Sequence, residues 1–387
     1  MFKFKEIFVC VICLSLIPFS LGLWIYNKAQ ANMYSGEIKD VTLYEYVSSE
    51  VLEKYSGDVS KLSEIESKVL DSLPQLKVVE VTMNFAGDCT LGTDPSFGYS
   101  NTFTDVFAAE KRYDYFFENM QELFANDDVT VVNLEGPFTD STNRVVKKFN
   151  FKGPAEYANI LISGNIDAVN LANNHTMDFG QKGYEDTLNT LNDYNIPYFG
   201  YDNYYIYEKD GVKIGFAGLT SIGDGTIYKR IDNAMVYFDE NDCDSKIFTF
   251  HWGIEREYCQ NGNQQKVGRY VIDKGADLVV GHHSHVLQGI EKYKGRYIVY
   301  SLANFCFGGN TNPPDKDTMV FNYKLKFENH KPKDIVATVY PARVSSVNNR
   351  NDYKPTLASG TERTRIMNKI LKYSNIKVDD NGIVIND

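Results

Sequence analysis

Residues 276–285 read ADLVVGHHSH, a short apolar run that ends in three histidines. The run has the length of a buried β-strand, and Gly281 gives the chain room to turn at its end. Successive side chains alternate in an extended backbone, so His283 and His285 face the same way and are able to share one metal ion or to bind two neighbouring ions. His282 points to the other side and is the bystander of the three. This stretch predicts a buried strand of an α/β fold with metal ligands at its carboxyl end.

Four other predicted strands deliver polar side chains in the same way. His175 follows IDAVNLANN and His251 follows KIFTF, so five of the six histidines lie just after a strand. Asp88 ends the alternating strand VEVTMNFAGD, and VTVVNLEG carries Asn133 and Glu135. Carboxylate, amide and imidazole groups at the carboxyl ends of several strands form the arrangement of a metal-assisted hydrolase.

The segment around the first of these histidines supplies a ligand and a proton donor. Asn174 offers an amide oxygen, which is a hard neutral metal ligand, and the adjacent His175 is able to act as a general acid. Asp178 either orients His175 or caps the helix that begins just after it. Taken singly, each motif also fits a purely structural role, since a lone histidine such as His251 is more often a core or rim residue than a metal ligand. Glu255 is expected to support a ligand rather than to bind an ion. Their convergence on one sheet edge favours a metal site.

Length and composition bound the possible functions. The 387 residues suffice for one large domain or two modest ones, and 43% hydrophobic and 24% charged residues are ordinary values for a globular protein. Forty Lys and Arg against 51 Asp and Glu give a net charge of −11. Such a chain lacks the basic excess of a nucleic-acid-binding protein. A polyanion is therefore expected to bind only at a local basic patch.

Residues 1–31 are predicted to be a membrane anchor or a signal peptide. The stretch from residue 7 to residue 26 carries no charge, and at about 1.5 Å per residue it spans about 30 Å, the thickness of a bilayer core. Lysines before it and acidic residues after it orient the amino end inside the cell and the remainder outside. Pro18 and Ala29-Gln30-Ala31 are typical of the alternative, a cleaved signal. The length of the run favours a single-pass anchor; both alternatives place the remaining chain outside the cytoplasmic membrane.

The rest of the chain divides into three predicted regions. Residues 32–78 read as a polar helical stalk, 79–345 alternate short apolar strands with helical stretches, and 346–387 form a polar tail with one helix. The alternation predicts an α/β fold with a layered sheet. Cys243 and Cys259 either form a disulfide or remain buried free thiols. Strands are expected at 79–87, 129–134, 166–172, 213–219, 246–251, 277–281 and 297–302, followed by an antiparallel pair over MVFNYKLKFEN and DIVATVYPARV.

The order of the motifs resembles that of a known family. FAGDCTLG, VVNLEGPFT, NLANNHTMDFG, FHWGIE and the long stretch from Gly275 to Phe305 follow one another over about residues 79–310. They resemble the capsule-synthesis CapA family of poly-γ-glutamate capsule proteins, which is related to the calcineurin-like metallophosphoesterases. The resemblance implies a four-layered α/β/β/α metallophosphatase-like sandwich in a membrane-anchored protein of the bacterial cell envelope.

The resemblance also implies roles for individual residues. His175 matches the position of the general acid, beside Asp178, and Lys152 and Asn133 are expected to contact the substrate. The nitrogen-rich donor set suits two divalent ions of Mn, Fe or Zn better than Mg²⁺ or Ca²⁺. The implied metal ligands are Asp88, Glu135, Asn174, His251, His283 and His285.

Two departures from ordinary metallophosphoesterases leave two functional alternatives. Cys89 and Thr90 follow Asp88, so the opening Asp-x-His is absent, and Glu135 stands where those enzymes usually have aspartate. One alternative is a metal-dependent hydrolase in poly-γ-glutamate capsule synthesis or export, or an extracytoplasmic metallophosphoesterase unrelated to capsule. The other is a non-catalytic scaffold of the capsule synthesis and export complex. The expected partners are poly-γ-glutamate or another anionic envelope polymer, the membrane and the subunits of that complex, and no nucleic acid.

Overall fold

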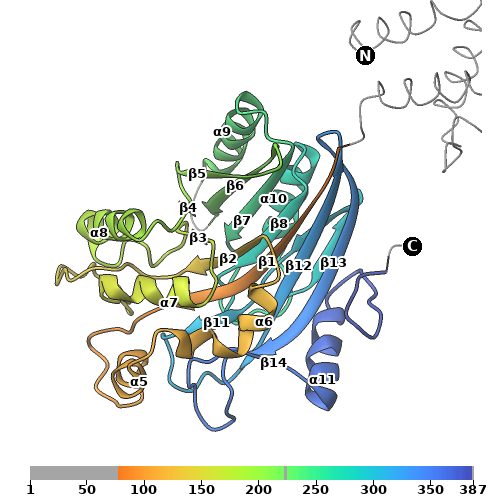
Figure 1. The fold of residues 1–387 in the computed structure, drawn as a ribbon. Helices are drawn as coiled ribbons and strands as arrows, with labels where there is room; N and C mark the ends of the chain where they lie inside the picture. Colours follow the sequence, from red (N-terminus) through yellow and green to blue (C-terminus); the bar gives the residue numbers. More distant parts are fainter. Residues whose placement is uncertain (1–76, 222–224, 386–387) are drawn as a thin grey trace, which may run out of the picture. The chain divides into compact units, whose positions relative to one another are not determined.

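The computed structural model describes residues 77–221 and 225–385 (Figure 1). The predicted anchor or signal over 1–31 and nearly all of the predicted stalk over 32–78 lie outside the described residues. Among the described helices, none is long and apolar enough to cross a membrane. Residues from Lys77 onward form one compact unit.

The first sheet has eight strands, and β1 lies in its middle. This strand pairs in parallel with β2 and β11 and antiparallel with β12. The strand order of this sheet is β14-β13-β12-β1-β2-β3-β4, and β11 pairs with β1 outside that order. The strands are β1 (Val78–Thr90), β2 (Val129–Leu134), β3 (Ala168–Asn170), β4 (Tyr198–Phe199), β11 (Asn304–Phe307), β12 (Asp317–Glu328), β13 (Lys331–Arg343) and β14 (Thr356–Leu357).

The second sheet has six strands in the order β5-β6-β7-β8-β10-β9. Its central strands β6, β7, β8 and β10 are parallel, and β5 and β9 join the two edges antiparallel. The strands are β5 (Tyr204–Lys209), β6 (Val212–Thr220), β7 (Ser245–His251), β8 (Leu278–His282), β9 (Ile290–Tyr293) and β10 (Arg296–Val299).

Alternating apolar side chains hold the two sheets and the outer helices together. In β2, Val129 and Val131 belong to the core between the sheets, whereas Val132 and Leu134 pack under helices on the opposite face. A third cluster lies between the second sheet and its own helices. The result is the α/β/β/α layering expected from the resemblance (Figure 1).

The helices divide between the two outer faces. Helices α9 (Ile227–Glu240) and α10 (Gly262–Asp273) cover the second sheet, where their apolar residues join its outer core. The outer core of the first sheet includes residues from the others, namely α5 (Phe103–Glu110), η2 (Asp114–Met120), α6 (Gln121–Phe124), η3 (Ala155–Tyr157), α7 (Ala158–Ser163) and α8 (Gly180–Asp193).

Residues 346–385, predicted as a polar tail, contribute to the packed unit. β14 pairs with β13, and helix α11 (Gly360–Leu371) buries Ile366, Met367 and Ile370 in the core that also holds the facing strands. Apolar side chains at positions i, i+1 and i+4 form one stripe of a helix, which explains how a mostly polar segment docks.

The predicted strands are present with shifts at their ends. The expected antiparallel pair is β12 with β13, and β1 extends beyond the predicted end to Thr90. Gly87 lies within this strand, where an added Cβ would stand 2.0 Å from the carbonyl oxygen of Ala303. The close approach of the Ala303 backbone therefore requires glycine there. Cys243 and Cys259 are both free thiols, and Cys259 is exposed.

Candidate metal centre

The first sheet presents a row of polar side chains where its parallel strands end. Asp88 of β1 lies opposite Asn133 of β2, which lies opposite Asn170 of β3. Asn133 Nδ2 donates to Asp88 Oδ1 at 2.8 Å, and Asn133 Oδ1 accepts from Asn170 Nδ2 at 2.9 Å. All three side chains are buried. The amide row thus fixes one oxygen of the Asp88 carboxylate from behind.

The loop after β3 brings an amide and an imidazole to the same place. Asn173 anchors this loop, because its side chain donates to the Leu134 carbonyl at 2.8 Å and accepts from the His175 N–H at 3.0 Å. The neighbouring Asn174 Oδ1 lies 2.6 Å from His251 Nε2 of the second sheet. The predicted ligand Asn174 therefore meets a predicted ligand from a strand 77 residues away.

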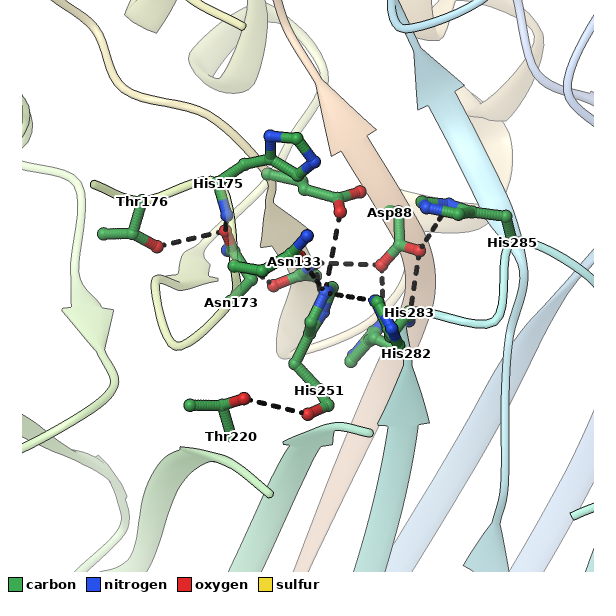
Figure 2. A network of polar contacts seen from close by, with 12 residues as sticks. Asp88, Asn133, Asn173, His175, Thr176, Thr220, His251, His282, His283 and His285 are labelled. Carbon is green, nitrogen blue, oxygen red and sulfur yellow. Dashed lines mark hydrogen bonds and ion pairs between the residues drawn. The ribbon is translucent and has the colours of Figure 1, made fainter. Parts of the chain in front are cut away.

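Four histidines complete the group: His251 ends β7, His282 ends β8, and His283 and His285 follow β8 in the chain (Figure 2). His251 Nε2 lies 3.0 Å from His283 Nδ1, and His285 Nδ1 lies 3.4 Å from Asp88 Oδ2. His251 and His282 are neighbours across β7 and β8. Figure 2 shows the side chains of Asp88, Asn133, His251 and His283 directed toward one another.

The backbone after β8 differs from the extended run that the sequence predicted. The strand ends at His282, and His283 and His285 have left-handed φ angles of 89° and 54°. The two imidazoles therefore converge through a coiled backbone rather than through strand alternation, with ring centroids 6.0 Å apart. His282, predicted to point away, has Nδ1 3.4 Å from Asp88 Oδ1. Conformations of this kind are uncommon for non-glycine residues and cluster at functional sites.

The surroundings of the Glu135 carboxylate indicate whether a cation fits at this site. The side chain is fully buried, and neither carboxylate oxygen has a hydrogen-bond partner among the described residues. The nearest imidazole atom, His251 Nε2, lies 3.6 Å from Oε1. A buried carboxylate without partners is strongly unfavourable unless a positive charge or a proton compensates it. The donor set of carboxylates, imidazoles and an amide fits a divalent ion.

The electrostatics show how the group is balanced by protons. Burial favours the neutral form of Asp88, but the nearby imidazoles of His282 and His285, each with Nδ1 3.4 Å from a carboxylate oxygen, outweigh burial and hold the pKa of Asp88 well below its usual value. Burial, followed by the charge of Asp88, raises the pKa of Glu135 to about 8. Burial opposes charge on His285 as well, yet Glu135 and Asp88 raise its pKa to about 10. At neutral pH the group therefore retains protons that a divalent cation is able to displace.

The remaining two histidines of the group are poised as neutral ligands. Burial and the positive charge of His285 lower the pKa of His283 to about 4. Burial and the neighbouring His283 hold the pKa of His251 well below its usual value. Neutral imidazole is the form that binds a metal ion.

Two sets of three side chains bring their ligand atoms within 4.8 Å of one another. One set is Asp88, Glu135 and His285, and the other is Glu255, His283 and His285. The first set is mostly buried, and the second reaches the surface through the exposed Glu255. They share His285, so the candidate ligands form one continuous group.

The predicted general acid has a defined environment beside this group. His175 Nδ1 lies 2.7 Å from Asp178 Oδ2, while Asp178 Oδ1 accepts from Lys147 Nζ at 2.5 Å. Lys147 Nζ also donates to the Asn174 carbonyl at 2.8 Å. Burial lowers the pKa of His175, and Asp178 opposes that effect. Helix α8 has Phe179 at its N-cap, so the contact of Asp178 is with His175 rather than with the helix end.

Lys147 was missed by the sequence reasoning. Lys152 was expected to contact the substrate, but in the structure its ammonium contacts protein groups. The Lys152 ammonium donates to the Ser141 carbonyl at 2.7 Å and lies 4.9 Å above the Phe179 ring centroid. The sequence feature that indicates a basic segment here is the run RVVKKFNFK, which carries four cations and no acid in a chain of net charge −11. Periodicity could not tell which of these cations would reach the loop of His175.

Asn133 and Asn304 also differ from expectation. Asn133 was predicted to contact substrate, but it is fully buried and its amide is occupied by protein partners. Its position indicates that it fixes Asp88. Asn304, at the end of the last resemblance motif, was not predicted; its Oδ1 lies 2.8 Å from His285 Nδ1. Its register opposite Asp88 became visible only in the sheet pairing.

Comparison with known proteins identifies the family. The model of the bacterial capsule synthesis protein PGA_cap matches residues 82–309, more than half of the chain. The chain belongs to this family. The resemblance inferred from the motifs is thereby confirmed.

Two curated relatives share this assignment. The PGA biosynthesis protein CapA of Bacillus subtilis (strain 168) is 29% identical over 269 residues, which cover 64% of this chain and 68% of that protein. The capsule biosynthesis protein CapA of Bacillus anthracis is 25% identical over 339 residues, which cover 79% of each. Among solved structures, the sulfate thiohydrolase SoxB of Thermus thermophilus is similar with a TM-score of 0.39 and 13% identity, over 67% of this chain and 56% of that chain.

Proposed function

We propose that this PGA_cap protein acts outside the cytoplasmic membrane in the synthesis or export of a poly-γ-glutamate capsule, through a divalent-metal hydrolase centre. Family membership and the names of the two CapA relatives support the capsule role. One observation carries the metal centre: within the described part of the chain, the buried Glu135 carboxylate has no hydrogen-bond partner, and it lies among Asp88 and imidazoles.

Six side chains would hold the ions in this proposal. When bound, two divalent ions of Mn, Fe or Zn supply Lewis-acid activation of water and of a substrate oxygen. The amide row behind Asp88 fixes the geometry of that carboxylate, and Asn304 orients the His285 ring. The proposed ligands are Asp88, Glu135, Asn174, His251, His283 and His285.

His175 is the proposed proton donor to the leaving group. Its Nδ1 faces Asp178, so the ring is held in one orientation and its other nitrogen is left for a substrate. Lys147 shares the Asp178 carboxylate and is one-quarter exposed, which leaves cationic surface beside the acid. A carboxylate-rich or phosphorylated substrate is attracted to such a surface although the whole chain is acidic. The bond that is hydrolysed is therefore proposed to lie in an anionic envelope polymer.

The localisation belongs to the same proposal. The uncharged run within residues 1–31 is proposed as a single-pass anchor, with cleavage as a signal peptide as the alternative. Residues 32–78 are proposed as a stalk between anchor and domain. Intact chain in the membrane fraction after alkaline extraction supports the anchor, whereas a released, shortened chain contradicts it.

A hydrolysis assay tests the catalytic proposal. Full-length protein in detergent is incubated with Mn²⁺ and either p-nitrophenyl phosphate or a γ-glutamyl anilide. His175→Ala is expected to lower kcat by at least about 100-fold with metal content unchanged. His330→Ala is the matched control, because this sixth histidine contacts Asp244 and lies outside the candidate ligand sets. Ion-loaded wild-type protein that hydrolyses neither probe would contradict catalysis.

A non-catalytic capsule scaffold is the second candidate, and a particular position favours it. Thr90 stands two residues after Asp88, where ordinary metallophosphoesterases have histidine, and its buried hydroxyl has no hydrogen-bond partner among the described residues. A scaffold predicts that His175→Ala leaves capsule formation intact while deletion of residues 1–31 abolishes it. Loss of capsule in the His175→Ala strain would reject this candidate.

A further inference from the structure

The loop after β7 lies beside the candidate ligands and is fixed at both ends. At its start, Trp252 is buried, and its Nε1 donates to the Tyr300 carbonyl at 2.8 Å. Farther on, the Arg256 N–H donates to the Ser284 carbonyl at 2.7 Å. Ser284 stands between His283 and His285 in the chain, so the loop is tied directly to the segment that carries these histidines.

Two left-handed residues shape the stretch between those ties. Gly253 has a φ of 86°, and an added Cβ there would meet the Gln264 side chain at 2.9 Å. Arg256 has a φ of 64°. Glu255 lies between these two bends, with an exposed side chain whose ligand atom comes within 4.8 Å of those of His283 and His285. The tied backbone therefore presents this carboxylate to the two histidines.

We propose that Glu255 is itself a metal ligand, binding on the solvent side of the ion held by His283 and His285; this inference rests on the proposed metal centre. Sequence reasoning gave Glu255 only a supporting role. The structure instead makes it the one carboxylate of a set with two imidazoles, whereas the buried set of Asp88, Glu135 and His285 has two carboxylates and one imidazole.

Charge supports this assignment. Two divalent ions bring four positive charges, and the buried carboxylates of Asp88 and Glu135 supply only two negative ones. A third carboxylate leaves one net positive charge, which still attracts an anionic substrate without the full repulsion between two ions. Because Glu255 is exposed, it is also the ligand that a substrate oxygen is able to displace.

Mn²⁺ binding to the full chain in detergent tests the inference. The EPR signal of free Mn²⁺ in a titration gives the number of bound ions and their dissociation constants. Glu255→Gln is expected to weaken one bound ion by at least about 10-fold and to leave the other unchanged. Glu257→Gln is the matched control, because it removes the same charge from the same loop and Glu257 belongs to neither ligand set.

The outcomes separate this inference from the proposed function. Wild-type protein with two ions and Glu255→Gln with one weakened ion support Glu255 as a ligand. Equal binding by wild type and Glu255→Gln overturns the role of Glu255 and leaves the metal centre standing. Equal weakening in Glu255→Gln and Glu257→Gln overturns it too, because the effect is then one of general charge. Wild-type protein that binds no Mn²⁺ overturns both proposals.

Discussion

Carboxylates lie near both ends of strands β1, β2 and β3, and the two groups differ in their hydrogen-bond partners. Asp127, Asp128 and Asp167 lie where β2 and β3 begin, and each accepts hydrogen bonds from neighbouring protein groups. Asp88 and Glu135 lie where β1 and β2 end, and Glu135 has no hydrogen-bond partner among the described residues. The same sheet therefore carries one acidic cluster whose three carboxylates all have protein hydrogen-bond donors, and one in which the described residues give Glu135 none.

The partners at the amino end are ordinary donors. Asp127 accepts from Asn84 Nδ2 and Thr130 Oγ1, both at 2.7 Å. Asp128 accepts from Lys209 Nζ at 2.6 Å. The comparison shows that this fold is able to supply hydrogen-bond donors to a cluster of partly buried carboxylates. At the carboxyl end Asp88 accepts from Asn133, whereas the described residues offer Glu135 no donor, and this difference supports the proposed cation there.

The largest expected effect is at Glu135. Glu135→Gln should reduce Mn²⁺ affinity by on the order of 100-fold, so that stabilisation by excess ion falls by about 2.7 kcal/mol. Metal-free stability should stay nearly unchanged, because the substitution removes no hydrogen bond. Urea unfolding with Mn²⁺ and with EDTA measures both quantities. A variant that unfolds earlier even in EDTA would mean that Glu135 has a protein partner.

Asp128 should show the reverse behaviour. Asp128→Ala leaves the Thr82 N–H without its side-chain acceptor and removes the ion-pair partner of Lys209, whose ammonium keeps its hydrogen bond to the Glu80 carbonyl. We expect a loss of about 1–3 kcal/mol in the free energy of unfolding. The loss should be the same in Mn²⁺ and in EDTA. A metal-dependent loss would show that the two ends are coupled and would weaken the comparison.

The pH dependence of the free energy of unfolding at Asp127 gives a further test of the comparison. Burial raises the pKa of Asp127 to about 7, so the folded protein binds this proton more tightly than the unfolded chain does. The stability from this proton is fully present below about pH 4 and is lost as pH rises through about 7. Asp127→Asn should therefore flatten the decline in unfolding free energy between pH 5 and pH 8 by on the order of 1 kcal/mol, discounted for partial exposure. Identical pH profiles of variant and wild type in EDTA would contradict the assignment.

The smallest effect is expected at Lys209. Its ion pair with Asp128 is partly exposed, with about one-third of the lysine side chain accessible. Lys209→Met should lower stability by at most about 1 kcal/mol, and less in high salt, since ions screen such pairs. Thermal unfolding at two salt concentrations checks this. An effect larger than that of Asp128→Ala would reverse the expected ranking.

Sequence reasoning predicted most of the fold and several of the side chains that the structure brings together at the strand ends; their roles as metal ligands stay a prediction. Alternating or continuous apolar runs located the strands around Val81, Val131 and Val279, because burial imposes that pattern directly. The gathering of Asp88 with Asn133 also followed, since parallel strands of one sheet end at a common edge. The sequence predicted one sheet edge for the whole site, but Asp88 belongs to the first sheet and His251 to the second, so the site joins two sheets.

What escaped prediction depends on contacts between distant segments. The convergence of His283 and His285 rests on left-handed backbone angles that ADLVVGHHSH does not reveal. Lys147 reaches Asp178 only because a loop folds over the His175 segment. Glu255 gains its place from the hydrogen bond between Arg256 and Ser284, which no local pattern encodes.

The most direct test is the location of bound ions in crystals grown with Mn²⁺, by anomalous scattering. We predict anomalous peaks among Asp88, Glu135, Asn174, His251, His283 and His285, with Glu255 on the open side. Mn²⁺ peaks only elsewhere, or hydrogen bonds to Glu135 from protein or water with no ion beside it, would contradict the proposal that these strand ends form a metal centre.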